Sequence, residues 1–334
     1  MDIDSQRKIS AILKILAGVG GPLGSTRIAE ELQMLGVDLK ERMVRYYLGE
    51  MDKSGLTRNL GRAGREITER GRKELETAVA IDKVGFVAAR VDELAYRMSF
   101  DPNRGVGTVI LNVSRIPVAD FPRVREIINT VLRAGLGMGR FVALGKEGDD
   151  LAGHLVPKGQ IAIGTVCSVT LNGALRQAGV PTISRFGGLL ELCDGKPLRF
   201  TQIIYYEWTT LDPVEIFIKG KMTQVLAAAE TGAGTIGASF REVPAASLPA
   251  VMHAVERLER VGLGGVLLVG RPGRPLLDIP VSQGRAGIIV AAGLNPMGAI
   301  EEAGIETENH AMASLHEFDD LIPIEDLGAR VQIA

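Results

Sequence analysis

The sequence predicts an N-terminal winged helix-turn-helix (mainly α), followed by an α/β (α+β) domain made of two repeats related by a pseudo-two-fold axis. Three amphipathic helical patterns and a glycine-bounded hairpin come first. The remainder contains an internal duplication, and in each copy strand-like runs alternate with helical ones. We expect the winged helix over 1–70, a helical connector over 71–83 and the duplicated domain over 84–334.

The first three helices are read from their apolar spacing and capping residues. The first has an i, i+3, i+4, i+7 pattern and ends at the glycine-rich break at 18–22. Ser25 is placed to cap a second helix that Gly36 stops, and Asp38 with Glu41 forms a capping-box arrangement for a third. The expected core residues are Ile9, Ile12, Leu13, Leu16, Ile28, Ala29, Leu32, Met43, Val44, Tyr47, Leu48 and Met51.

A two-stranded wing follows the third helix, formed by residues 56–59 and 65–68 around a Gly-Arg-Ala-Gly turn. The segment 53–73 holds seven basic and two acidic residues in a chain whose net charge is −2, which indicates a local anion-binding face. The third helix would enter the major groove of double-stranded operator DNA, and the wing would contact phosphates or the minor groove. The predicted DNA-binding residues are Ser25, Thr26, Arg27, Lys40, Arg42, Arg45, Tyr46, Arg58, Arg62 and Arg65.

Two alternatives stay open for this module. Winged helices also serve as protein–protein modules, and Tyr46 suits a core position as well as an outward one. Operators for winged helices usually contain two half-sites, so we expect a homodimer.

The duplication aligns GTVILNVSRIPVADFPRVREIINTVLRAGLG from Gly107 with GTIGASFREVPAASLPAVMHAVERLERVGLG from Gly234, without a gap. A second block from Gly159 aligns with one from Gly284. We place repeat one at about 105–200, an intervening strand segment at 200–220 and repeat two at about 232–327. The predicted order in each is strand, helix, strand, strand, helix, over 108–113, 121–134, 139–144, 160–166 and 172–178, and over 235–240, 248–261, 265–269, 285–291 and 296–303. Paired repeats of this kind place a small-ligand site at their seam.

Positions where the repeats differ in kind are candidates for that site. A Ser-Arg next to a Gly-Gly offers a guanidinium and backbone N–H groups to a carboxylate or phosphate, and polar residues of TVCSVTLN replace mostly apolar ones of the sister copy. Ordinary turn chemistry is the alternative, also for the two threonines before the Leu-Asp-Pro turn. The candidates are Thr165, Cys167, Ser168, Thr170, Asn172, Ser184, Arg185, Gly187, Gly188, Thr209 and Thr210.

Composition points away from several other classes. The chain has 334 residues, 46% of them hydrophobic, which fits more than one core. No apolar run of about 18 residues and no signal peptide are visible, so a cytoplasmic protein without membrane partners is expected. Its two cysteines and four histidines lack metal-ligand spacing, so neither a metal nor a cofactor is expected. No catalytic motif is present and Cys167 suits a buried thiol, although an enzyme fused to a winged helix stays an alternative.

The motif blocks GTVILNVS, GTVCSVTLNGALRQAGVPTISRFGGLLEL, TTLDPVEIFI and GASFREVP resemble the NrpR nitrogen-regulatory repressors over nearly the whole chain. This resemblance implies a dimeric repressor that leaves the operators of nitrogen-assimilation genes when it binds 2-oxoglutarate. A dicarboxylate fits the candidates above, and Arg241 within GASFREVP would supply a second cation. A response to another small carboxylate or amino acid is the alternative, as is a DNA binder without a ligand.

Overall fold

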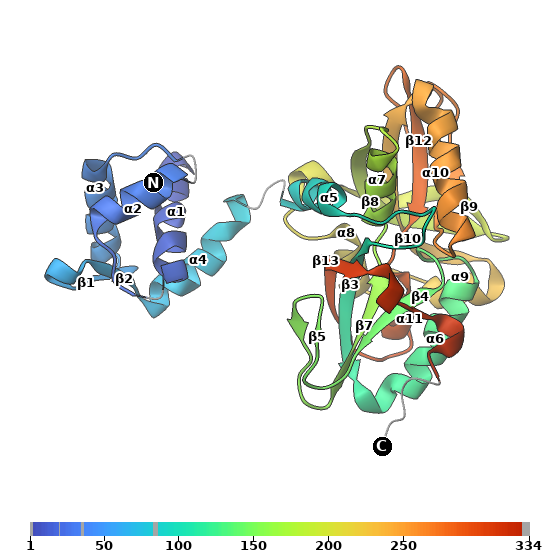
Figure 1. Ribbon diagram of the computed structural model, residues 1–334, viewed down its shortest axis with the longest axis horizontal. Helices are drawn as coiled ribbons and strands as arrows, with labels where there is room; N and C mark the ends of the chain where they lie inside the picture. Colours follow the sequence, from blue (N-terminus) through green and yellow to red (C-terminus); the bar gives the residue numbers. More distant parts are fainter. Residues whose placement is uncertain (1–2, 20, 35–36, 83–85, 329–334) are drawn as a thin grey trace. The chain divides into compact units, whose positions relative to one another are not determined.

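The computed structural model describes residues 3–19, 21–34, 37–82 and 86–328 of the chain. It contains two compact units, Met1–Val84 and Gly85–Ala334, each described by itself (Figure 1). Gly36, predicted to stop the second helix, lies outside the described residues, as do Gly20 of the first break and position 83 of the expected connector.

The first unit is a winged helix. The predicted apolar pattern closes its core, because Ile12, Leu13, Ile28, Leu32 and Leu48 are all buried there. Its elements are α1 (Ile3–Val19), α2 (Ser25–Met34), α3 (Glu41–Lys53), β1 (Thr57–Asn59), β2 (Arg65–Ile67) and α4 (Glu69–Asp82). Gly64 precedes β2 with φ +103°, and a Cβ there would meet the Leu23 carbonyl oxygen at 2.3 Å, so the wing requires glycine at this position.

Two details of the first unit differ from the prediction. Asp38 does not cap the third helix, because α3 begins at Glu41 with Lys40 as its N-cap and no side-chain cap bond. Glu41 instead accepts a hydrogen bond from Ser25 Oγ at 3.1 Å, which ties α3 to the start of α2. Met43 is not in the core but 42% exposed, since one step along a helix turns a side chain by about 100° away from its buried neighbour Val44.

The second unit contains two five-stranded sheets, a two-stranded sheet of β5 and β6, and covering helices. Its first half comprises α5 (Phe86–Arg97), β3 (Thr108–Pro117), α6 (Phe121–Arg133), β4 (Phe141–Gly145), β5 (Asp150–Leu151), β6 (His154–Leu155), β7 (Gln160–Val166), α7 (Val169–Gln177), β8 (Ile183–Cys193) and β9 (Lys196–Tyr205). The turn η3 (Tyr206–Trp208), α8 (Pro213–Lys219) and α9 (Val225–Thr231) connect it to the second half. That half comprises β10 (Gly234–Pro244), α10 (Leu248–Arg260), β11 (Val266–Val269), β12 (Arg285–Ala291), α11 (Asn295–Glu302), β13 (Glu308–Glu317) and β14 (Ile322–Pro323).

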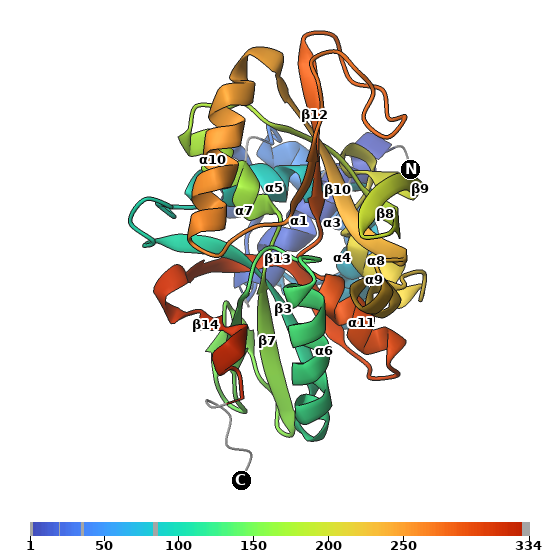
Figure 2. The ribbon, with the colours of Figure 1, turned by 90° about the vertical axis from the view of Figure 1, so that its right-hand side faces the viewer.

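The two repeats exchange strands. One five-stranded sheet has the order β11-β12-β10-β8-β9 and the other β13-β3-β7-β4-β14, so each takes three strands from one repeat and the last strands from the other. The two repeats therefore do not form two separate lobes. Figure 2 shows the exchange, with β8 of the first repeat beside β10 of the second, and β13 of the second repeat beside β3 of the first.

The strand pairings in the two sheets follow the pseudo-two-fold symmetry at the level of single residues. Leu111 of β3 faces Val166 of β7, and Ala238 of β10 faces Ala291 of β12, which are the positions that the sequence alignment equates. The predicted strands and helices of both repeats are present in the predicted order. What the prediction lacked is the strand that leaves each repeat for the other sheet, β8 and β13.

Each hydrophobic core also draws on both repeats. One cluster joins Val109 and Ile110 of β3 to Ile288 and Val290 of β12, and the other joins Ile128 of α6 to residues of β8, β10 and α11. The repeats therefore fold as a single interlocked body. Within the described ranges, no helix is long and apolar enough to cross a membrane, and no cluster of three or more potential metal ligands occurs.

Candidate functional site

The outer face of α3 carries the side chains predicted to read DNA. Arg42, Arg45 and Tyr46 are exposed on it, while Val44, Tyr47 and Leu48 of the same helix are buried. Thr26 and Arg27 are exposed in the first turn of α2, where helix N–H groups suit a phosphate. One face of the winged helix thus combines cations with a helix N-terminus, and Tyr46 is 59% exposed rather than part of the core.

The three arginines of the wing are not equivalent. Arg65 is predominantly structural, since its Nε donates to Asp52 Oδ2 at 2.8 Å and its side chain is only 21% exposed. Arg58 donates to Glu66 on the neighbouring strand, which offsets part of its charge. Arg62 is exposed in the turn between the strands and suits a phosphate or the minor groove.

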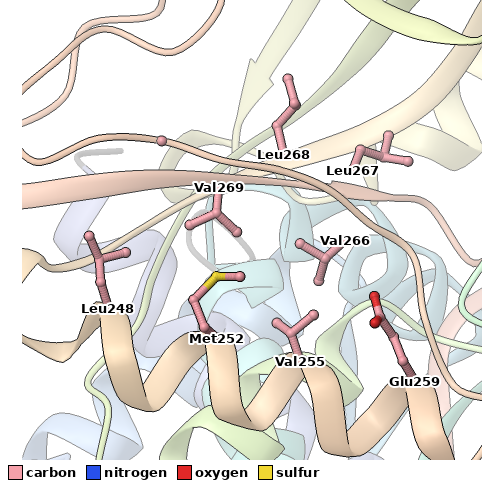
Figure 3. Close-up of a pocket in the computed structure, with 9 residues that line it drawn as sticks. Leu248, Met252, Val255, Glu259, Val266, Leu267, Leu268 and Val269 are labelled. Carbon is pink, nitrogen blue, oxygen red and sulfur yellow. The ribbon is translucent and has the colours of Figure 1, made fainter.

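The second unit has a wide groove and a small pocket that differ in chemistry. The groove, of about 480 Å³, lies between α10 and β11 and is lined by Leu248, Met252, Val255 and the strand, with Glu259 as its one charged side chain (Figure 3). It has an apolar lining and a carboxylate, so it offers nothing that attracts an anion. The small pocket at the seam of the repeats is lined by polar side chains as well as apolar ones and is the candidate ligand site.

The seam pocket lies on the pseudo-two-fold axis. Three pairs of equivalent positions line it, one member from each repeat: Asn112 with Ser239, Cys167 with Ala292, and Ser168 with Gly293. The repeats touch at this point, because a Cβ on Gly293 would meet the Val166 carbonyl oxygen at 2.1 Å. The remaining wall consists of Tyr206, Asp212 and Val214 of the segment from η3 to α8, and of Leu294 and Ala311 of the second repeat.

A buried cation lies directly behind Ser168 and Ser239. Arg241 is 1% exposed and donates from Nε to Asn172 Oδ1 at 2.6 Å and from Nη1 to Ser239 Oγ at 2.7 Å. Its Nη2 donates to the carbonyl and the hydroxyl oxygen of Ser168 at 3.0 and 3.1 Å. It forms no ion pair with any carboxylate in the described part of the chain, and burial lowers its pKa. A guanidinium held by neutral acceptors alone leaves a positive potential at the pocket.

The acidic groups around this cation are biased toward their neutral forms. Burial raises the pKa of Cys167 to about 12 and also raises the pKa of Tyr206. Burial likewise raises the pKa of Asp212, although its Oδ1 accepts hydrogen bonds from the N–H groups of Val214 and Glu215 as the N-cap of α8. A buried cation without a carboxylate partner among the described residues favours an anionic ligand over a cationic one.

Both units of the chain match models of known protein families. Residues 84–322 match the family model described as NrpR regulatory domains NRD1 and 2, and residues 10–75 match that of the ribonuclease R winged-helix domain. The chain is 36% identical over 321 residues to the global nitrogen regulator NrpRI of Methanosarcina mazei, with 96% of this chain and 99% of that protein covered. The chain belongs to the NrpR family.

Two further comparisons place this NrpR-family chain among longer relatives and a solved structure. It is 31% identical to the global nitrogen regulator NrpR of Methanocaldococcus jannaschii over 95% of its own length, and spans about half of that relative, 55%. It is similar to the crystal structure of a nitrogen repressor-like protein from Methanococcus jannaschii, with a TM-score of 0.59, 28% identity and coverage of 71% of this chain and 97% of that one.

The structure brings part of the predicted ligand set of this NrpR-family chain together. Cys167 and Ser168 line the pocket, Arg241 and Asn172 lie behind it, and Ser184 accepts a hydrogen bond from Asn172 Nδ2 at 2.9 Å. Thr165 is buried one layer away and accepts a hydrogen bond from Asn112 Nδ2 at 3.3 Å. These residues come from β7, the turn between β7 and α7, α7 itself, β8 and β10, and the strand exchange places β8 beside β10.

Other predicted residues are used by the fold itself. Thr170 Oγ1 bonds the backbone of Ile110, and Thr209 Oγ1 closes its own turn on Leu211, so turn chemistry explains Thr209. Gly187 and Gly188 lie in the middle of β8 between β10 and β9, so their N–H groups serve the sheet instead of a ligand. Arg185 is half-buried on β8 and does not line the pocket, nor does Thr210.

Sequence reasoning missed Asn112, Ser239, Tyr206 and Asp212 as pocket residues. The repeat alignment contained a signal for the first two, because Asn112 and Ser239 are polar residues at equivalent positions, each between two apolar neighbours on a buried strand. Asp212 had a local signal as well, an Asp-Pro that opens a helix. Tyr206 had none, since its place depends on the path of η3 back over the seam.

Proposed function

We propose that this chain is a nitrogen-regulating transcriptional repressor that binds operator DNA as a homodimer and releases it when the seam pocket binds 2-oxoglutarate. The family and the winged helix support a transcriptional regulator, and the similarity to global nitrogen regulators supports nitrogen metabolism as what it regulates. The observation that carries the ligand proposal is Arg241, a fully buried guanidinium without a carboxylate partner among the described residues.

A dicarboxylate complements this environment. Ser168 and Ser239 present hydroxyl groups at the pocket surface, and Arg241 behind them favours negative charge on the ligand. Charge-assisted hydrogen bonds of this kind contribute about 1.5–3 kcal/mol each.

The pocket has a volume of about 20 Å³, which is room for one water molecule. A dicarboxylate therefore requires the wall to move. The wall outside the repeats, η3 to α8, is held by Glu215, which accepts a hydrogen bond from Ala311 N, and by Lys219, which pairs with Glu301 at 2.8 Å. Ligand binding then selects an opened arrangement, and the shift in population changes the spacing of two recognition helices in the dimer.

The test is operator binding by the full chain, measured by fluorescence anisotropy with and without millimolar 2-oxoglutarate. DNA upstream of its own gene and of neighbouring nitrogen genes serves as the operator. A fall in affinity of about 5–150-fold is expected for a coupling of 1–3 kcal/mol. Unchanged affinity at saturating 2-oxoglutarate would reject this effector, and a panel of other carboxylates and amino acids would then identify a different one.

A further inference from the structure

The groove between α10 and β11 has a counterpart in the other sheet, between α6 and β4. Val266 of β11 faces Val290 of β12. Val142 of β4 faces Thr165 of β7, and Thr165 is the residue that the repeat alignment equates with Val290. The strand β11 is therefore the equivalent of β4, and α10 is the equivalent of α6. Beyond β4 the sheet continues into β14, where Ile322 pairs with Val142, whereas β11 is the last strand of its own sheet.

Residues 321–327 fill the counterpart groove. The strand β14 leads into the turn η6 (Ile324–Asp326), which packs on α6. Three apolar side chains of this segment are buried in the same core cluster as the inner face of α6, namely Ile322, Ile324 and Leu327. A short strand followed by one turn, with apolar residues at these spacings, is thus what this fold uses to cover such a groove.

No such segment reaches the α10–β11 groove. The strand β8 is the equivalent of β13, but the chain turns back after it at Asp194 and Gly195 into β9, on the far side of that sheet. Within the described ranges, the outer edge of β11 has no strand partner. Figure 3 shows Met252 and Val255 of α10 turned toward β11, and Met252 is 53% exposed. An open strand edge beside an apolar groove is the arrangement that binds an extended segment by strand addition.

The two grooves differ in charge. In the filled groove, Arg140 just before β4 forms an ion pair with Glu325 of η6 at 3.8 Å. The residue just before β11 is Gly265, so the open groove lacks this cation. Its charged residue is Glu259, which stands where the repeat alignment has Leu132 and forms no ion pair in the described part of the chain. Because complementary charge selects the partner of an interface, the open groove favours a basic segment.

This preference distinguishes another protein from a second copy of this chain. The segment 321–327 of a second copy is buried in its own groove, and its Glu325 and Asp326 would face Glu259 with like charge. We propose that the α10–β11 groove binds an extended segment of another protein. This segment adds a strand to β11, covers Met252 with apolar side chains and carries a lysine or arginine that pairs with Glu259. The proposal goes beyond the proposed function and does not depend on its effector.

The test is the binding of two labelled peptides to the full chain, measured by fluorescence anisotropy. One peptide is LIPIEDLG, the sequence of residues 321–328, and the other is LIPIKKLG, in which lysine replaces both acidic residues. The lysine peptide is expected to bind about tenfold more tightly, because its charge is complementary to Glu259. Met252→Lys should weaken its binding, since this change removes apolar surface and adds a like charge. Equal affinity of the two peptides, or no binding of either at about 1 mM, would overturn the proposal.

A charge reversal in the groove makes the test independent of disruption. Glu259 is exposed, so Glu259→Lys should keep the fold and reverse the preference, binding LIPIEDLG more tightly than LIPIKKLG. Glu230→Lys is the matched control, because Glu230 is exposed on α9 and does not line the groove. Hydrogen exchange of wild type with the lysine peptide should slow at the amides of β11 and stay unchanged in β9. A preference that Glu259→Lys leaves as in wild type, or protection outside the groove alone, would reject the site.

Discussion

Arg241 of the second repeat donates a hydrogen bond from Nε to Asn172 Oδ1 of the first repeat at 2.6 Å, and both side chains are buried. Asn172 donates onward from Nδ2 to Ser184 Oγ of β8 at 2.9 Å. A strand of one repeat, a helix of the other and the exchanged strand are thereby joined through a single cation. The charge at the seam and the packing of the repeats are consequently one structural feature, and changing Arg241 tests both.

Arg241→Gln is expected to weaken 2-oxoglutarate binding by about tenfold or more, because a charge-assisted interaction is worth about 1.5–3 kcal/mol. Glutamine still donates toward neutral acceptors, so operator binding without ligand should persist and the repressor should become insensitive to the effector. Ligand-induced thermal shift measures the first effect and anisotropy the second. Arg185→Gln is the matched control, since Arg185 neighbours the site in sequence without lining the pocket, and should respond as wild type does. Equal loss in both variants would count against the pocket.

Glu215 predicts a pH dependence of stability. Burial raises its pKa to about 7, from 4.5, so the folded chain keeps a proton that the unfolded chain loses. Between about pH 4.5 and 7 the unfolded state therefore binds fewer protons, and the free energy of unfolding should fall by about 1–3 kcal/mol as the pH rises. Glu215→Gln should flatten this slope and be more stable than wild type at pH 8. Urea denaturation at pH 5, 6, 7 and 8 measures it.

The control for Glu215→Gln is Glu207→Gln, which removes an exposed carboxylate from the same segment and should keep the wild-type slope. In Glu215→Gln the side-chain amide keeps an oxygen that accepts a hydrogen bond from Ala311 N, so the contact between α8 and β13 is retained. A slope that is identical in wild type and Glu215→Gln would show that this group titrates at the same pH in both states.

Local pattern and internal repetition carried most of the fold prediction. Apolar spacing located Ile12, Leu13 and Leu48, because a helix that covers a core must repeat its apolar positions every three to four residues. The alignment of the repeats located their strands and helices, because both copies solve the same packing problem. The sequence did not predict the strand exchange. Whether β8 pairs with β10 or with a strand of its own repeat, the same alternating residues are buried, so the local sequence pattern does not distinguish the two arrangements.

Comparison of the two repeats predicted part of the site and misassigned another part. Divergence between the repeats pointed to Cys167 and Ser168, which line the pocket. Divergence also pointed to Gly187, where the cause is steric: a Cβ there would meet Pro213 Cβ at 2.9 Å and Tyr206 Oη at 3.1 Å. A glycine that admits a neighbour and a glycine that offers its N–H to a ligand look identical in sequence. Only the structure separates them.

The winged helix predicts two different effects on DNA binding. Arg42→Ala on α3 should reduce operator affinity by about 1–3 kcal/mol and relax sequence preference, as expected for a side chain that reads base edges. Arg62→Ala in the wing turn should weaken all sequences alike and lower the slope of log affinity against log salt by about 1, as expected for a phosphate contact. Anisotropy titrations at several salt concentrations, with operator and scrambled DNA, distinguish them. A change of sequence preference in Arg62→Ala would place it at base edges instead.

Arg65→Ala is expected to act on stability. Its Nε bonds Asp52 Oδ2 at 2.8 Å with both side chains largely covered, so removing it leaves a half-buried carboxylate unpaired. A loss of about 1–3 kcal/mol follows from that unsatisfied group. Thermal denaturation should therefore show a lower melting temperature of the winged helix in Arg65→Ala than in Arg62→Ala. Comparable stabilities with a larger loss of affinity in Arg65→Ala would instead assign Arg65 to the DNA contact.

Gly187→Ala tests whether the segment from η3 to α8 is seated on β8 by close contact. The added Cβ would lie 2.9 Å from Pro213 Cβ and 3.1 Å from Tyr206 Oη, so the segment must move outward. Because the interior has little free space, a loss of about 1–3 kcal/mol in the free energy of unfolding is expected. Gly264→Ala is the matched control, since a Cβ there meets nothing within 4 Å. Urea denaturation compares the two. Equal stability of both variants would mean that the segment yields freely, and Gly187→Ala should then bind 2-oxoglutarate more tightly than wild type, because its pocket would already be partly open.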